Sequence, residues 1–193
     1  MTPQELPLPL TTDRLSLRAY RESDAEALLP VYSREDVSQF LLCEPWTAEV
    51  AAAEIAKRIR RIGLETDSRA LALIVETADG LDDIEGSVVI GDVGIWLTGE
   101  SSETAEVGWV LNPAAGGHGF ASEAATALLN VAFDHYGLHR VVAQMDARNT
   151  ASAKLAERIG MRQEAHLRQN WWSKGEWTDT VIFGMLSSDR QNA

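Results

Sequence analysis

The chain has 193 residues, of which 45% are hydrophobic and 24% charged, as expected for a globular protein with one sizeable core. Its net charge of −12 excludes a general nucleic-acid binder, because such proteins present a basic face to phosphates. The single cysteine, Cys43, excludes a disulfide framework, and no apolar run reaches the roughly 18 residues of a membrane span. We therefore expect a cytoplasmic protein with no nucleic-acid or membrane partner. An acidic surface suits cationic partners such as amines, or simply serves solubility.

The first third of the chain predicts an extended segment, one strand and two helices. Three prolines favour an extended lead-in over residues 1–10. Alternation of polar and apolar residues over 14–19 predicts a half-buried strand. A short helix is expected over 23–33, and a second one begins near Thr47, where apolar residues start to recur at helical spacing.

The apolar period then changes to that of strands. Runs over 70–75, 84–97 and 105–111 are joined by short turns, which predicts an antiparallel meander. Gly91 and Gly94 interrupt the middle run, so it is either one bent strand or a hairpin.

The segment from Glu106 to Glu123, EVGWVLNPAAGGHGFASE, combines a strand, a glycine-rich turn and the start of a helix. Glycines let the backbone approach a ligand closely, and the first N–H groups of a helix have no partner within the helix. The combination predicts a cradle for a phosphate group.

The rest of the chain returns to alternating helices and strands. Helical spacing runs over 119–136 and 149–159, and strand-like runs cover 140–145, 163–172 and 178–186. These elements predict an α/β single domain with a mixed, mostly antiparallel seven-stranded sheet flanked by about four helices.

Four local signatures, in this order, resemble the GNAT superfamily of acyl-CoA-dependent N-acyltransferases, and within it the RimJ/RimL-like branch. They are RLSLR (14–18) with SDA (23–25), EVGWVL (106–111) with GHGFASEA (117–124), Asn149-x-x-Ser152-x7-Gly160, and EAHLR (164–168) with Gly175 and Asp179. The resemblance implies a GNAT-like N-acetyltransferase domain over 11–188, preceded by the 1–10 lead-in and followed by a tail, 189–193.

The resemblance also implies an acetyl-CoA site and no metal. Backbone groups of Val110 and Leu111 are expected to contact the pantetheine arm and the oxyanion. The pyrophosphate is expected at the glycine-rich loop and the first helical turn, which comprise Gly116, Gly117, His118, Gly119, Phe120, Ala121 and Ser122. Asn149 is expected to cap its helix and to bind the pantetheine arm as well.

Catalysis needs a neutral amine and a stabilised leaving thiolate. Many family members carry a tyrosine acid seven residues after the asparagine, where this chain has Ala156, and Ser152 is the expected substitute. A carboxylate base that some members place on the closing hairpin would fall near Trp171. Glu106 is the other candidate base, acting through water; the alternative is a structural salt bridge.

Trp46, Trp171, Trp172 and Trp177 cluster at expected loops and at the closing hairpin. Trp171 and Trp172 point to opposite sides of a strand, so only one of them can line a pocket. We expect a core position for any single tryptophan, and a homodimer if the hairpin aromatics are exposed.

The leading hypothesis is an acetyl-CoA-dependent N-acetyltransferase acting on a protein N-terminal α-amine or a small amine. An acyl-CoA-binding regulatory module without turnover is the alternative, motivated by Gly116, Ala156 and Trp171. A nucleotide hydrolase is disfavoured because the loop lacks the Gly-Lys-Ser/Thr ending. A nicotinamide enzyme is disfavoured because the pattern predicts no parallel βαβ unit.

Overall fold

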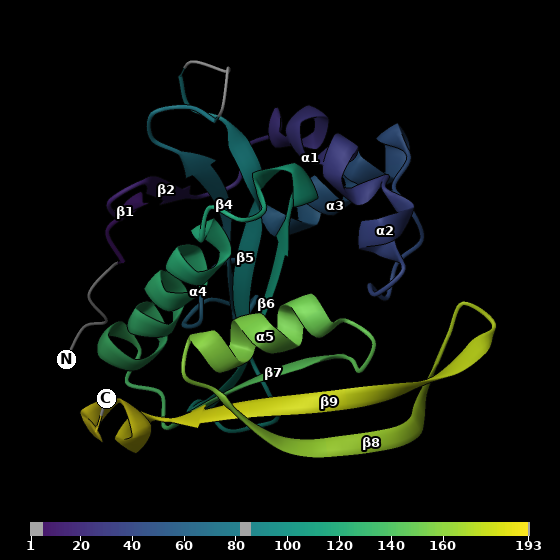
Figure 1. Cartoon of the computed structure of the whole chain (residues 1–193). Coiled ribbons are helices and arrows are strands. Elements are labelled where there is room, and N and C mark those ends of the chain that lie inside the picture. Colours follow the sequence, from purple (N-terminus) through teal and green to yellow (C-terminus); the bar gives the residue numbers. More distant parts are fainter. Residues whose placement is uncertain (1–5, 82–85, 193) are drawn as a thin grey trace.

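The computed structural model describes residues 6–81 and 86–192. Its centre is one mixed sheet with the strand order β1-β2-β4-β5-β6-β7-β9-β8, and β3 pairs with β4 (Figure 1). The strands are β1 (Leu10–Thr11), β2 (Leu15–Arg18), β3 (Ile62–Gly63), β4 (Ala70–Thr77), β5 (Val89–Leu97), β6 (Thr104–Leu111), β7 (Arg140–Asp146), β8 (Arg162–Ser173) and β9 (Glu176–Leu186).

The helices form a layer on each side of this sheet. Helices α4 and α5 lie together on one side, α1 to α3 gather at one end of the molecule, and the β8–β9 hairpin projects beyond the body (Figure 1). The helices are α1 (Asp24–Tyr32), α2 (Glu35–Ser38), α3 (Ala48–Arg58), α4 (Phe120–Asn130) and α5 (Thr150–Arg158), with shorter helical turns at Pro113–Ala115, Val131–His135 and Ser187–Asn192.

Strand alternation divides the buried residues between two cores. Leu71, Val93 and Val107 belong to the larger core, which α4 joins, whereas Ala72 and Ile74 belong to the smaller core with residues of α1 and α3. Successive side chains of a strand point to opposite faces, so each central strand contributes to both cores. The small number of helical residues in the second core leaves part of that face open.

Strands β6 and β7 pair in parallel, and the chain between them passes through α4. This β6–α4–β7 unit corrects the expectation that no parallel βαβ unit is present. The parallel pairing is confined to three residue pairs: Thr104 with Arg140, Ala105 with Val141, and Glu106 with Val142. Beyond Glu106, β6 continues beside β5 while β7 continues beside β9, so the two strands diverge and open a gap in the sheet.

The predicted fold class is confirmed, with differences in detail. The seven long strands are joined by β1 and β3, which have two residues each, and α2 adds a helix to the expected four. The interrupted run ending at Leu97 is a single strand from Val89, although Ile84 and Glu85 lie outside the described residues. Residues 1–5 of the lead-in and residue 193 of the tail also lie outside them.

Side chains cap α3 and α5, but the expectation that Ser23 or Asp24 caps the first helix is wrong, because Ser23 occupies the N-cap position of α1 without a side-chain hydrogen bond. Thr47 caps α3 by accepting a hydrogen bond from the Val50 N–H, and Ala51 and Ile55 face the core. The helical pattern over 119–136 divides instead into α4 and a wider turn at Val131–His135, which continues the buried stripe through Ala132.

Candidate active site

The glycine-rich loop ends at the N-terminus of α4 in a conformation that only glycine adopts readily. Gly117 has a φ of +82° and Gly119 a φ of +80°, both in the left-handed region. Gly119 occupies the N-cap position of α4, and no side chain in the described part of the chain caps this helix. The N–H groups of Phe120, Ala121 and Ser122 therefore lie in a helix turn without a capping acceptor, which makes an anion cradle.

Two members of the expected phosphate loop have other roles in its geometry. Gly116 is not left-handed: its N–H donates to the Pro113 carbonyl at 2.9 Å, and a Cβ there would meet the same oxygen at 2.9 Å. The His118 carbonyl accepts a hydrogen bond from Arg14 Nη1 at 2.8 Å, and its ring stacks on Phe120. Position 116 therefore requires glycine, because the backbone there lies close to the Pro113 carbonyl oxygen. The hydrogen bond from Arg14 holds His118 to the start of β2.

Arg14 and Glu123 fasten the start of α4 to the first long strand. Arg14 Nη2 lies 2.6 Å and Arg14 Nε 2.8 Å from Glu123 Oε2, and the Thr12 hydroxyl donates to Glu123 Oε1 at 2.5 Å. Burial raises the pKa of the Glu123 carboxyl, but hydrogen bonds from Thr12 and Arg14 outweigh it and hold that pKa below its usual value. Both residues lie within the family-like signatures, yet no sequence spacing indicates that they touch.

On the α4/α5 side of the gap between β6 and β7, Asn149 and Ser152 lie one turn apart. Asn149 Oδ1 accepts from the Ser152 N–H at 3.1 Å, so the expected helix cap is present. Trp109 Nε1–H donates to Ser152 Oγ at 3.2 Å, a partnership that the sequence did not indicate. The hydroxyl proton of Ser152 thus remains available to another acceptor. Ala156 is fully buried in the larger core.

Val110 and Leu111 lie on the part of β6 that has left β7. They pair with Asp92 and Gly91 of β5, so their other backbone edge faces the gap. Gly91 has a φ of +150°, and a Cβ built there would overlap the Val110 carbonyl oxygen at 2.2 Å. The close approach of β5 to β6 at this point therefore requires glycine.

A cleft of about 830 Å³ opens on the other face of the sheet, between α1–α3 and the β8–β9 hairpin. Its floor includes the small residues Ala70, Ala72, Gly94 and Gly108 of three adjacent strands. Short side chains on strands that carry no covering helix leave room for a substrate.

Glu106 lies on this floor at the last position where β6 pairs with β7. Gln144 Nε2 donates to its Oε2 at 2.9 Å, and no lysine or arginine among the described residues pairs with it. The interpretation of Glu106 as a structural salt bridge is therefore wrong. Burial raises the pKa of the Glu106 carboxyl above its usual value, and the hydrogen bond from Gln144 offsets only part of that effect.

Glu106 and Ser152 approach from opposite faces. Val107 and Trp109 belong to or pack against the larger core, so the alternating Glu106 and Gly108 face the cleft. The cleft reaches through the gap, because Trp109, Asn149 and Ser152 also line it. The structure thus brings the two predicted catalytic side chains to one cavity by way of the diverging strands.

A buried cluster that the sequence did not predict forms the end wall of the cleft. Arg58 Nη1 donates to Asp92 Oδ2 at 2.9 Å, to the Tyr32 hydroxyl at 2.8 Å and to the Tyr20 hydroxyl at 3.2 Å. Burial raises the pKa of Asp92, and burial together with the Asp92 charge raises the pKa of Tyr32 well above its usual value. Along the chain, each residue of this cluster is 12 to 34 residues from the next one, so only the folded structure brings them together.

The tryptophans divide between the core, the cleft and the surface. Trp46 is buried and stacks on Tyr32 with ring centroids 3.9 Å apart, as a core residue should. The core expectation is wrong for Trp171, Trp172 and Trp177, which are 48%, 59% and 57% exposed. Trp171 lines the cleft, whereas Trp172 and Trp177 pack edge to face on the hairpin.

Within residues 6–81 and 86–192, no group of three or more histidine, cysteine, aspartate or glutamate side chains is arranged to hold a metal ion. Within the same ranges, no helix has the length and apolar character needed to cross a bilayer.

Comparison with known proteins agrees with this architecture. Residues 14–162 match the model of the acetyltransferase (GNAT) domain family. The chain is 29% identical over 180 residues to the uncharacterized N-acetyltransferase p20 of Bacillus licheniformis, covering 93% of this chain and 97% of the relative. It superposes on the crystal structure of a GNAT-family acetyltransferase from Bacillus anthracis with a TM-score of 0.78 and 26% identity, covering 93% and 98% of the two chains.

More distant structures share the fold and contain bound CoA. Spermidine N-acetyltransferase from Vibrio cholerae, in complex with CoA and spermine, has a TM-score of 0.74 at 20% identity, covering 94% of this chain and all of its own. RimL, the ribosomal L7/L12 α-N-protein acetyltransferase, in complex with CoA, has a TM-score of 0.75 at 19% identity, covering 92% and 97%. The family match spans most of the length of the chain, including the glycine-rich loop, Glu106 and Ser152, and the protein therefore belongs to the GNAT acetyltransferase family.

Proposed function

We propose that this protein transfers the acetyl group of acetyl-CoA to a primary amine by direct attack. The observation that carries the proposal is the gap between β6 and β7, which joins an anion cradle and Ser152 on one side to Glu106 and an open cleft on the other. In this reaction the amine nitrogen forms a bond to the thioester carbonyl carbon, the carbon–sulfur bond breaks, and the amine loses a proton while the thiolate gains one.

The described backbone fits acetyl-CoA along the gap. The pyrophosphate would lie against Gly117, Gly119, Phe120, Ala121 and Ser122, where nothing lies within 4 Å of a Cβ built at Gly117. The backbone groups of Val110 and Leu111 that face the gap would form hydrogen bonds with the amides of the pantetheine arm. The side-chain amide of Asn149 would lie beside the same arm. Gly116 and His118 would shape the loop, which Arg14 fastens to β2.

Glu106 would accept the proton of the attacking amine, directly or through water. A carboxylate with a raised pKa is a stronger base, and the absence of a paired cation among the described residues leaves it free to act. An α-amine has an ordinary pKa of about 7.7–8.0, whereas a lysine amine has one of about 10.4, so an α-amine or a comparable weakly basic amine needs less help.

Ser152 would protonate the departing thiolate. Its oxygen already accepts the Trp109 N–H, so its own proton is directed elsewhere, and α5 fixes the side chain beside Asn149. The buried position of Ala156 favours this assignment, because a tyrosine at that place would have to displace core side chains. A thiol with a pKa of about 8.5 leaves readily, so the contribution of Ser152 is modest.

The same departure from the family pattern motivates a second candidate, an acyl-CoA-binding module without turnover. Calorimetry with acetyl-CoA, followed by a thiol-release assay with amines and N-terminal peptides, separates the two. Binding with turnover supports the transferase, and binding without turnover on a broad panel supports the module. A protein that binds no acetyl-CoA would contradict both.

A further inference from the structure

Most charged groups that line the cleft are matched with an opposite charge. Arg58 pairs with Asp92 at 2.9 Å, and Arg148 pairs with Asp146 at 2.7 Å and with Glu176 at 2.8 Å. Glu54 pairs with Lys57 at 2.6 Å.

Three lining groups have no such match among the described residues. The Lys174 ammonium donates to the Ser38 carbonyl and so ties the turn of the β8–β9 hairpin to α2. Glu106 has only the neutral Gln144 as a hydrogen-bonding partner. Arg61, an exposed residue, makes no side-chain hydrogen bond or ion pair with any described residue. Among the described residues, the cleft therefore retains an unmatched carboxylate, an ammonium held by a neutral carbonyl, and a guanidinium that is free to bind a ligand.

Arg61 is fixed at its base although its side chain is free. Its carbonyl accepts from the Ala72 N–H of β4 at 2.8 Å, and its N–H donates to the Arg58 carbonyl at 3.0 Å. The backbone at the end of α3 is thus held against the strand that forms the floor of the cleft.

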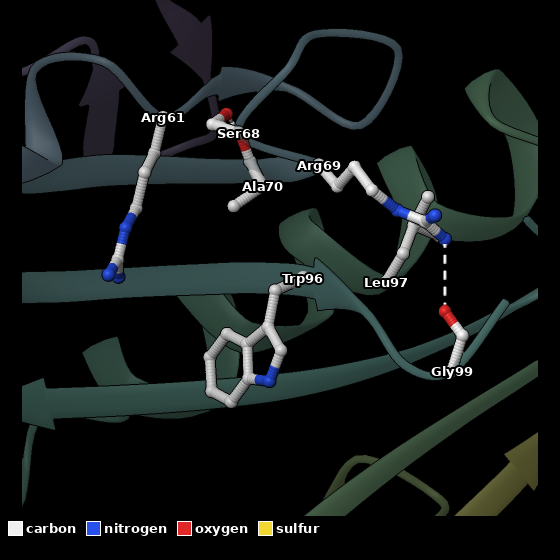
Figure 2. Close-up of a pocket in the computed structure, with 7 residues that line it drawn as sticks. All are labelled: Arg61, Ser68, Arg69, Ala70, Trp96, Leu97 and Gly99. Carbon is white, nitrogen blue, oxygen red and sulfur yellow. Dashed lines mark hydrogen bonds between the residues drawn. The ribbon is translucent and has the colours of Figure 1, made fainter.

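A second cavity of about 610 Å³ extends the cleft past this arginine (Figure 2). Arg61, Ala70 and Trp96 line both cavities, so the two adjoin each other at these residues. Arg69 extends toward Gly99 and donates to the carbonyls of Gly99 and Ser101 at 3.2 Å each. The Arg61 side chain points to the same end of the cavity as the Trp96 indole, away from Gly99 (Figure 2).

Strand register places Glu106, Trp96 and Ala70 in one row, and the Arg61 backbone lies beyond this row, beside β4 and opposite Ala72. From there the Arg61 side chain points back toward the end of the cavity that holds the Trp96 indole (Figure 2). Glu106 is opposite Trp96, and Trp96 is opposite Ala70, so the row crosses two strand spacings, on the order of 10 Å. The Trp96 indole lies over Gly108, because a Cβ built there would meet its ring at 3.1 Å. The indole therefore forms an apolar surface beside Glu106, at the end of the cavity toward which Arg61 points.

We propose that the acceptor carries an oxyanion, either a carboxylate or a phosphate, about 10 Å from the amine that is acetylated. Arg61 binds the oxyanion, the Trp96 indole supports the chain between the two groups, and the amine lies at Glu106. The proposal rests on the proposed acetyltransferase function and narrows its substrate to zwitterionic amines. An extended tripeptide has a suitable span between its α-amine and its carboxylate, at about 3.3–3.6 Å per residue. A polyamine is disfavoured, because its second cation would lie beside Arg61.

The test uses two matched pairs of acceptors with the full-length protein. One pair is Ala-Ala-Ala as the free acid and as the C-terminal amide, and the other is 6-aminohexyl phosphate and 6-aminohexanol. We expect kcat/KM to be about five- to tenfold higher for the anionic member, with the preference shrinking as salt is added. A preference in only one pair identifies which oxyanion is recognised and supports the proposal.

Variants of two arginines decide where the preference arises. Arg61→Gln should raise KM for the anionic acceptors alone, with kcat and the values for the uncharged acceptors unchanged, and Arg61→Lys should restore part of the preference. The matched control Arg69→Gln should keep the preference, because that guanidinium is engaged by backbone carbonyls. Equal effects of Arg61→Gln on both members of a pair, or no preference in the native protein, would overturn the proposal.

Calorimetry of the same acceptors with CoA-saturated protein keeps the two proposals apart. Selective binding of the anionic members without any turnover would contradict the proposed function and support the oxyanion site. Turnover of all four acceptors without preference would support the proposed function and contradict the oxyanion site.

Discussion

The two faces of the sheet are assembled from the chain in different ways. On the α4/α5 face, the anion cradle comes from one continuous segment, and Asn149 and Ser152 come from one helix start. On the face beside α1 and α3, the cleft draws on residues from Tyr20 to Thr180. The proposed cofactor side is thus a local structure, whereas the proposed acceptor side is a product of strand register and helix placement.

This difference predicts different kinds of mutational effect. Backbone conformation dominates the proposed cofactor side, so substitutions there should act on binding. Individual charges dominate the proposed acceptor side, so substitutions there should act on turnover, its pH dependence and acceptor choice. Four substitutions test the contrast, in order of decreasing expected effect.

Gly119→Asp should abolish CoA binding, measured by calorimetry. An aspartate at this position would place a carboxylate at the N-terminus of α4, where it competes with and repels the pyrophosphate. Gly137→Asp is the matched control, because Gly137 is also left-handed, with a φ of +64°, and lies outside the loop. Normal CoA binding by a folded Gly119→Asp protein would show that the cradle has been assigned to the wrong place.

Glu106→Gln should lower kcat by about 10²- to 10³-fold while CoA affinity stays unchanged. The native enzyme should gain activity with rising pH as Glu106 deprotonates, through a pKa above the usual value for glutamate, and the variant should lack this step. Glu103→Gln, at an exposed turn, serves as the control. A variant that retains the step would assign the titration to the acceptor amine instead.

Ser152→Ala should reduce turnover by about 10- to 100-fold with little change in CoA affinity. The loss should be smaller with a thioester whose thiol is more acidic, because such a leaving group needs less protonation. Ser33→Ala, at the end of α1, is a control outside the cleft. Equal losses with both thioesters would indicate that Ser152 positions the substrate and does not act as an acid.

Glu123→Gln should lower the free energy of unfolding by about 1 kcal/mol at pH 7 and weaken CoA binding only slightly. The Glu123 pKa lies below its usual value in the folded protein, so the carboxylate stabilises the fold above the unfolded pKa of about 4.3, and this stabilisation is lost as pH falls through the folded value. Thermal melts of the two proteins should therefore converge in acid.

A control for that substitution removes another partly exposed ion pair. Asp134→Asn breaks the contact between Asp134 and Arg190 at 2.7 Å, far from the loop, and should leave CoA affinity unchanged. If Glu123→Gln also leaves CoA affinity unchanged, the contact of Arg14 with the His118 carbonyl suffices to hold the loop.

Several features were predictable because they depend on neighbours in the chain. Alternation over 14–19 and apolar runs elsewhere predicted the seven long strands, Thr47 marked a helix start, Asn149 predicted a helix cap, and Gly117 and Gly119 predicted the loop. The parallel pairing of β6 and β7 was not predictable in the same way, because pairing direction depends on where the chain returns after α4. The homodimer and the cytoplasmic location stay predictions.

The sequence by itself determined the fold class, the strand–loop–helix cradle and the helix that presents Asn149 and Ser152, because each depends on periodicity or on residues within a few positions. Only the tertiary structure decided that Trp109 binds Ser152, that Glu106 forms no salt bridge with a described residue, and that Arg61 faces the cleft without a partner among those residues. These relationships join residues tens of positions apart, and strand register and helix packing, which no local pattern encodes, bring them together.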